Sequence, residues 1–146
     1  MSFIINPEQF ITEQMCRVKS YFSSNRQKLA GFETKQRFID WYLHELYFHE
    51  NKCHYCKTSI LDIRMLLNAN IVSGRRVKGA GFRGANLELD RRDAFGEYNE
   101  GNCVLSCYYC NNDKSNTFDY EVYKEIIGPA KKRVWEELLR RLNFKA

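Results

Sequence analysis

The sequence of 146 residues has few prolines and no long apolar run. Two prolines and a hydrophobic fraction of 44% argue against wholesale disorder. No stretch approaches the roughly 18 consecutive apolar residues that a membrane helix needs, and the N-terminus lacks the basic-then-apolar pattern of a signal peptide. Internal repeats, low-complexity tracts and linkers are also missing. We therefore expect one compact cytoplasmic domain, residues 1–146, with no membrane partner.

Positive charge is concentrated in one part of the chain. The formal net charge of +5 indicates little by itself, since many soluble proteins are mildly basic. Residues 75–92, however, contain two acidic side chains and six basic ones, which are Arg75, Arg76, Lys78, Arg83, Arg91 and Arg92. Basic side chains around a carboxylate favour binding of a phosphodiester.

Six cysteines in a cytoplasmic chain indicate metal ligands or free thiols more than disulfides. Four of them form two CxxC pairs, Cys53 with Cys56 and Cys107 with Cys110. This spacing predicts one structural zinc ion held by four thiolates that joins distant segments. The alternatives are two unconnected knuckles or redox dithiols. The remaining two, Cys16 and Cys103, are interpreted as small buried hydrophobic residues.

Residues 85–116 combine the features most suggestive of a site. Alternation of Leu87 and Leu89 with polar residues predicts a half-buried strand that ends at Asp90. Turn formers fill residues 93–101, and a second apolar run, 103–105, predicts a returning strand. The polar run 111–116 follows the second CxxC and predicts a helix.

Helical patterns flank this stretch on both sides. We expect helices over about 7–30, 34–49 and 57–68, then a loop over 69–84 that contains four glycines and four basic residues. Two further helices are predicted over 119–127 and 129–142, separated at Gly128-Pro129.

Taken as a set, these motifs resemble the HNH, or ββα-metal, nucleases in their four-cysteine zinc form. The resemblance rests on the upstream CxxC, Asp90-Arg91 at a strand end, Asn102 before the second strand and the CxxCN segment, and it covers roughly residues 53–116. Small restriction and phage nucleases are similar. It implies an α+β, mostly helical domain with N-terminal helices in 1–52, a zinc-stapled ββα-metal core with its basic loop in 53–116, and C-terminal helices in 117–146.

The resemblance also implies an activity, metal-dependent hydrolysis of DNA phosphodiester bonds. Asp90 and Asn111 would hold a catalytic divalent ion, Mg²⁺ or Mn²⁺, whereas zinc would be structural because four thiolates leave it no open position. Asn102 matches the asparagine that holds the loop between the strands and thereby positions the base. The other interpretation of Asn102 is an ordinary turn residue.

Arg91 departs from the family pattern, which usually has histidine at this position. Arginine stays protonated and cannot be a general base, although it can grip the scissile phosphate. We expect the base to be Tyr42, which lies in a segment resembling one in Asp-Arg members, or else His49 or His44. Tyr42 could equally be a core aromatic with a satisfied hydroxyl.

Double-stranded DNA is the expected partner. The residues predicted to contact it are Arg75, Arg76, Lys78, Arg92 and Lys114. Because one site cuts one strand, cleavage of both strands would require a homodimer or two sequential events.

Two other functions compete with the nuclease. One is a zinc-stapled nucleic-acid-binding module that has lost catalysis, and the other is a zinc-ribbon domain that binds proteins. Asp90 separates the first from an enzyme, because a pure binder has no need of a carboxylate facing a phosphate. The basic loop argues against the second.

Overall fold

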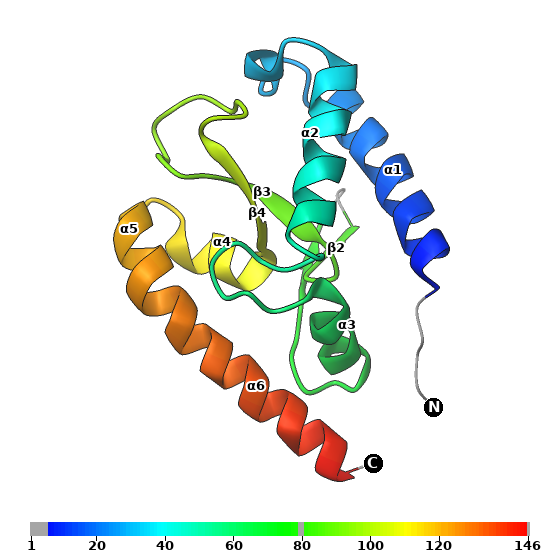
Figure 1. Cartoon of the computed structure of the whole chain (residues 1–146), viewed down its shortest axis with the longest axis vertical. Coiled ribbons are helices and arrows are strands. Elements are labelled where there is room, and N and C mark those ends of the chain that lie inside the picture. Colours follow the sequence, from blue (N-terminus) through cyan, green and yellow to red (C-terminus); the bar gives the residue numbers. More distant parts are fainter. Residues whose placement is uncertain (1–5, 79–80, 146) are drawn as a thin grey trace.

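The computed structural model describes residues 6–78 and 81–145. Helices surround two small antiparallel hairpins (Figure 1). In chain order the elements are α1 (Pro7–Ser24), η1 (Ala30–Phe32), α2 (Lys35–Phe48), α3 (Ile60–Asn68), β1 (Arg75–Val77), β2 (Gly81–Arg83), β3 (Leu87–Arg91), β4 (Cys103–Cys107), α4 (Tyr108–Lys114), α5 (Tyr120–Val122), η2 (Tyr123–Ile127) and α6 (Gly128–Lys145). The mixture confirms the predicted α+β class.

The hairpin β3–β4 and helix α4 form the centre of the fold. The register places Asp90 opposite Val104 and Glu88 opposite Ser106. Helix α4 begins directly after β4, and the Cys107 sulfur caps it by accepting a hydrogen bond from the Cys110 amide at 3.4 Å. Every residue of β4 is buried. Strand, turn, strand and helix thus follow one another in the predicted order.

Helices α1 and α2 pack against each other on one side of this centre. Asn6 caps α1 ahead of Pro7, and Thr34 caps α2. The prediction that the first helix continues to about residue 30 is wrong, because it ends at Ser24. The Asn25 side chain donates to the Tyr21 carbonyl at 2.8 Å and so replaces the next helical bond.

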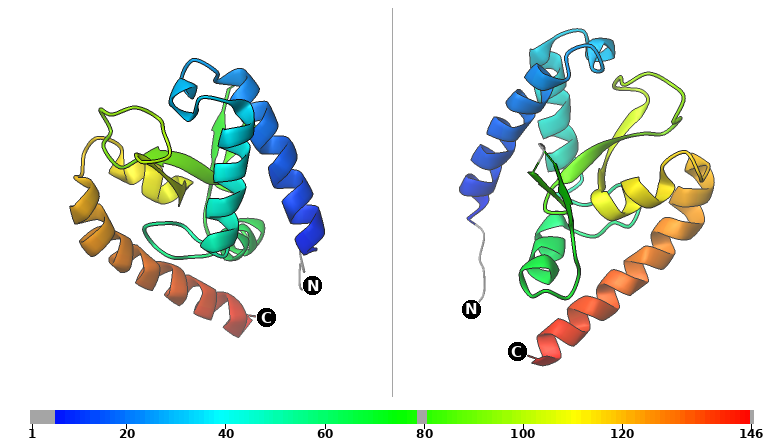
Figure 2. Two further views of the ribbon diagram at one scale, coloured as in Figure 1. Left: turned by 45° about the horizontal axis from the view of Figure 1, so that its top comes forward. Right: turned by 180° about the vertical axis from the view of Figure 1, so that it is seen from behind.

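The predicted break at Gly128-Pro129 is also wrong, since α5, η2 and α6 follow one another without interruption. A wider π turn, Tyr123–Ile127, ends two residues before Pro129 and accommodates its ring, which would otherwise clash with a carbonyl of the preceding turn. At Gly128 a Cβ atom would lie 2.5 Å from the Tyr55 carbonyl oxygen, so glycine permits close packing there. Figure 2 shows α6 and α1 on opposite sides of the central hairpin.

Part of the expected loop 69–84 forms a second hairpin, β1–β2, in which Arg75 pairs with Arg83. Its three-residue strands carry mostly exposed side chains, so no alternation of apolar and polar residues predicts them. Cys103 is buried as expected, but Cys16 is exposed on α1, so its interpretation as a buried residue is wrong. None of the helices within the described residues is both long and apolar enough to cross a membrane.

Candidate metal centre and cationic cleft

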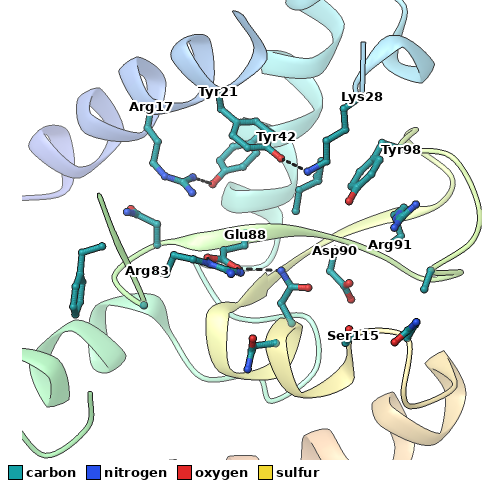
Figure 3. A pocket seen from close by; sticks show the side chains of 18 of the residues that line it. Arg17, Tyr21, Lys28, Tyr42, Arg83, Glu88, Asp90, Arg91, Tyr98 and Ser115 are labelled. Carbon is teal, nitrogen blue, oxygen red and sulfur yellow. Dashed lines mark hydrogen bonds and ion pairs between the residues drawn. The ribbon is translucent and has the colours of Figure 1, made fainter. Parts of the chain in front are cut away.

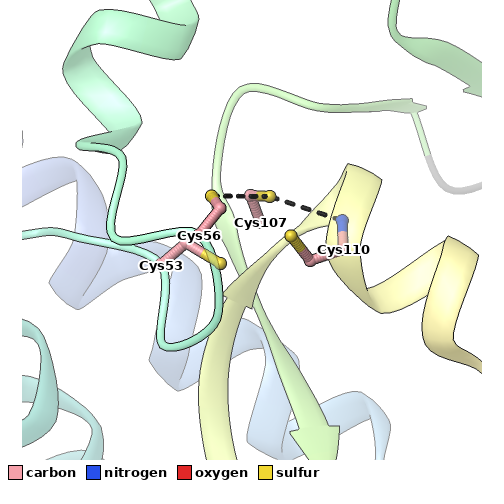
Figure 4. A group of neighbouring side chains, drawn as sticks. All are labelled: Cys53, Cys56, Cys107 and Cys110. Atoms are coloured by element: carbon pink, nitrogen blue, oxygen red, sulfur yellow. Dashed lines mark hydrogen bonds between the residues drawn. The ribbon is translucent and has the colours of Figure 1, made fainter. Parts of the chain in front are cut away.

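The four paired cysteines converge on one point in the interior (Figure 4). Their sulfur atoms all lie within 4.8 Å of one another, and all four residues are 0% exposed. Tetrahedral zinc with Zn–S bonds of about 2.3 Å separates its sulfur ligands by roughly 3.8 Å, so the cluster fits this ion with little movement. Hydrogen bonds among the sulfur atoms lower the pKa of Cys56 and raise that of Cys107, so without a metal the cluster shares protons among its thiols.

The first knuckle, residues 53–56, contacts the central hairpin through a backbone amide and through one aromatic side chain. The His54 amide donates to the Leu105 carbonyl at 2.9 Å and thereby attaches the knuckle to β4. Burial lowers the pKa of His54 to about 3, so its ring is neutral at physiological pH. Tyr55 is buried, and its hydroxyl donates to Asp90 Oδ2 at 2.5 Å.

Asp90 is buried at the end of β3. Burial raises its pKa, while the hydrogen bond from Tyr55 and the charge of Lys114 oppose the rise. Lys114 Nζ lies 3.4 Å from Oδ2, on the same oxygen that Tyr55 contacts. Oδ1 is therefore the freer oxygen and the one best able to face a cation. Burial and the Asp90 carboxylate both raise the pKa of Tyr55, so Tyr55 keeps its proton and remains the donor.

Asn111, on α4, has its side chain oriented by a carboxylate. Its Nδ2 donates to Glu88 Oε1 at 3.0 Å. Because a carboxylate only accepts hydrogen bonds, the amide nitrogen must face Glu88 and Oδ1 must face away from it. Glu88 in turn accepts two hydrogen bonds from Arg83, which neutralise its charge. Glu88 is thus occupied as an ion-pair partner, and the Asn111 oxygen is free to act as a ligand.

The loop between β3 and β4 is organised by Asn102. The Asn102 side chain accepts from the Asp93 amide at 2.9 Å and donates to the carbonyls of Asp93 and Glu97. Arg91 joins the same loop, since Nη1 donates to the Gly96 carbonyl at 3.0 Å and the guanidinium carbon lies 4.4 Å from the Tyr98 ring centroid. The loop is therefore held in one conformation beside Asp90.

A cleft of about 930 Å³ opens beside β3. Asp90, Glu88, Arg91 and Asn111 line it from the central motif, while α1 and the turn after it supply the facing wall with Arg17, Tyr21 and Lys28. Figure 3 shows these three side chains on the far side of β3 from Ser115, at the end of α4. The lining includes four cationic and two acidic side chains, and both acids already have cationic partners. The cleft is consequently suited to an anion.

This geometry has a counterpart among solved structures. The described fold is similar to that of the rare-cutting HNH restriction endonuclease PacI, an enzyme that perturbs DNA. The two are 27% identical, the similarity covers 84% of this chain and 80% of PacI, and the TM-score is 0.63. The chain has an HNH-type fold. No protein-family model and no curated protein sequence matches it.

The three predicted proton acceptors differ in their position relative to the cleft. Tyr42 lines the cleft, whereas His49 and His44 do not. His49 pairs with Glu45 at 3.1 Å, and His44 is exposed. The Tyr42 hydroxyl accepts from Arg17 at 2.9 Å and contacts the Leu87 carbonyl at 3.2 Å, and burial raises its pKa against the opposing charge of Arg17.

Four of the five predicted DNA contacts are exposed in the HNH-type fold, namely Arg75, Arg76, Lys78 and Arg92. Lys114 is not, and its prediction as a phosphate contact is wrong. It is 1% exposed and donates to the Arg91 carbonyl at 2.9 Å in addition to its ion pair with Asp90. The spacing of three residues does place it on the face of Asn111, but that face packs against β3.

Two residues of this region, Tyr55 and Glu88, are missing from the sites predicted from the sequence. Tyr55 lies between two cysteines of the cluster, where no pattern indicates that its hydroxyl reaches a strand 35 residues away. The charge of Lys28 permits a nucleic-acid contact, but the sequence favours its interpretation as part of a solvated charged face. Glu88 could have been found, because residues two apart on a strand share a face and Asp90 was already a candidate.

Proposed function

We propose that the chain is a metal-dependent DNA endonuclease of the HNH type. Its similarity to an HNH restriction endonuclease supports a nuclease-type function. The observation that carries the proposal is that Asp90 and Asn111 line the same cationic cleft in a chain that also holds the four-cysteine cluster. A carboxylate in such a cleft is unfavourable for a protein that only binds phosphates, but it is required by one that holds a cation there.

Asp90 and Asn111 would hold Mg²⁺ or Mn²⁺ through Oδ1 of each side chain. Both are hard oxygen ligands. Glu88 occupies the amide nitrogen of Asn111, and Tyr55 and Lys114 occupy Oδ2 of Asp90. When bound, such an ion withdraws charge from the phosphate and the leaving oxygen. The cysteine cluster would hold structural zinc, which fixes α4 against β3–β4.

The chain's own side chains would do the remaining work. Arg91 would bind the scissile phosphate and stabilise the charge that develops on it, after exchanging its bond to the Gly96 carbonyl for phosphate oxygens. Asn102 would keep the Arg91 loop in place. Tyr42 stays our prediction for the proton acceptor. Its raised pKa means that the nearby Arg17 charge must stabilise its anion for this role.

DNA would approach along the basic hairpin β1–β2. Arg75, Arg76 and Lys78 project from it without a buried role, and Arg92 is exposed on the β3–β4 loop, where it contacts the Tyr120 ring. These residues would contact backbone phosphates and base edges of double-stranded DNA. With one site per chain, cutting both strands would use a homodimer or two successive nicks, as a restriction enzyme requires.

The test is cleavage of supercoiled plasmid with Mg²⁺ or Mn²⁺ by the wild-type chain and by Asp90→Ala, both assayed first for bound zinc. We expect the wild type to nick or linearise the plasmid, the zinc-loaded variant to be inactive, and chelation of the added divalent ion to stop the wild type. Glu97→Ala is a matched control, because this exposed carboxylate lies on the β3–β4 loop outside the cleft and accepts no side-chain hydrogen bond among the described residues.

Arg91 favours a second candidate, a zinc-stapled binding module without catalysis, because arginine cannot act as a base and here is bonded to a carbonyl. The same experiment separates the two. If wild type and Asp90→Ala both leave every plasmid and oligonucleotide intact, yet bind DNA with a steep salt dependence, the binding module replaces the nuclease.

A further inference from the structure

Three cations of the cleft have no acidic partner among the described residues. Within residues 6–78 and 81–145, no carboxylate oxygen lies within the ion-pair distance of 4.0 Å of a side-chain nitrogen of Arg17, Lys28 or Arg91. Two of them come from the α1 wall, which the resemblance to HNH nucleases did not cover. Their charge is therefore available to a ligand.

Neutral tyrosines hold these cations instead. Arg17 donates to the Tyr42 hydroxyl at 2.9 Å. Lys28 donates to the Tyr21 hydroxyl at 3.2 Å and lies 4.6 Å from the centroid of the Tyr98 ring, the same ring that Arg91 contacts. Hydroxyls and aromatic faces orient a cation without cancelling its charge. Burial raises the pKa of Tyr42, so in the free protein its hydroxyl is protonated and leaves the charge of Arg17 uncancelled. The wall is thus positioned by its neighbours and remains positive.

Close packing fixes this wall relative to the active hairpin. Gly31, three residues after Lys28, has no room for a side chain, because a Cβ atom there would lie 2.4 Å from the Tyr98 carbonyl oxygen. The turn that carries Lys28 is therefore docked directly on the β3–β4 loop. Lys28 and Arg91 approach one aromatic ring from segments more than 60 residues apart in sequence, and the cleft lies between the α1 wall and β3.

We propose that Arg17 and Lys28 form a phosphate-binding site on the α1 wall, for the backbone phosphate next to the one at Asp90. The inference rests on the proposed function for the identity of the ligand, a nucleic-acid strand. The Tyr21 hydroxyl adds a neutral hydrogen-bond donor at the same place. A phosphate between two fixed cations also sets the register of the strand, so that the next phosphate meets Arg91 and Asp90.

Lys28→Ala tests the site, since Lys28 is exposed and its loss leaves the core intact. Binding to a short duplex is measured over a range of salt concentrations with Ca²⁺ or without added divalent ion. The controls are Lys19→Ala and Arg26→Ala, which remove the same charge from exposed positions of α1 and its following turn, outside the cleft. The variant Lys28→Arg should retain the site.

Loss of one phosphate contact lowers the slope of log affinity against log salt by about 0.9. We expect this decrease for Lys28→Ala, with slopes close to wild type for Lys28→Arg and both controls. Equal slopes for Lys28→Ala and the controls would overturn the proposal. If the slope falls as expected while the wild type cuts no DNA, the phosphate site stands and the nuclease assignment fails. If the wild type cuts DNA but Lys28→Ala has no selective effect on the slope, the nuclease assignment stands and the phosphate site fails.

Discussion

Glu88 is expected to act on the divalent ion through Asn111 rather than by binding it. The Glu88 side chain is 13% exposed, so water cannot readily replace it, and its Oε1 accepts from Asn111 Nδ2 at 3.0 Å. A hydrogen bond to a charged group contributes about 1.5–3 kcal/mol. Removing it frees the amide to rotate away from the ion. Loss of such a partner typically weakens a metal site about 10–100-fold.

Glu88→Ala should therefore bind Mn²⁺ about 10–100-fold more weakly than the wild type, as measured by electron paramagnetic resonance titration of the zinc-loaded protein. Glu88→Gln is the matched variant, because its amide oxygen can still accept from Asn111, and it should retain most of the affinity. Glu97→Ala controls for the loss of one negative charge, since Glu97 is exposed and lies outside the cleft. Unchanged Mn²⁺ affinity in Glu88→Ala would refute the positioning role. Equal, severe loss in Ala and Gln variants would instead make Glu88 a direct ligand.

Three further predictions concern the interior of the site. Lys114→Met leaves the buried Asp90 carboxylate without its cation. The free energy of unfolding in urea should therefore fall by about 3 kcal/mol, and Mg²⁺ should raise the melting temperature of the variant more than that of the wild type. Equal stability would contradict the Lys114–Asp90 pairing. Tyr55→Phe removes a bond that lowers the Asp90 pKa, so the acidic limb of the cleavage pH profile should move to higher pH, whereas an unmoved limb would exclude this role. Cys107→Ser should lose zinc and cooperative thermal unfolding, while the exposed Cys16→Ser should retain both; a zinc-loaded Cys107→Ser would disprove the four-thiolate site.

The central motif was predictable because its signals are local. The two CxxC pairs, the alternation before Asp90 and the turn formers after it lie within short windows, and each has few structural solutions. The structure accordingly has β3, β4 and the cysteine cluster at the predicted positions. Asp90 and Asn111 also line one cleft, although their roles as ligands stay predictions.

The surroundings of the motif depend on contacts between distant segments, which a single sequence does not display. The β1–β2 hairpin has strands too short for a periodic pattern. The helical junction at Gly128 is set by packing against the Tyr55 carbonyl. Lysine is usually a surface residue, yet Lys114 is buried because it contacts the Asp90 carboxylate and the Arg91 carbonyl across the α4–β3 contact. In each case tertiary packing overrides a reasonable local rule.

Whether Asp90 and Asn111 together hold the divalent ion is open to direct measurement. Crystals of the zinc-loaded chain with a duplex oligonucleotide and Mn²⁺ would give an anomalous difference map that distinguishes the two metals by their absorption edges. We expect a manganese peak about 2.0–2.3 Å from an oxygen of each side chain, and a separate zinc peak among the four cysteine sulfurs. A manganese peak at Glu88, or no peak in the cleft of a chain that cuts the same oligonucleotide, would contradict the proposed site.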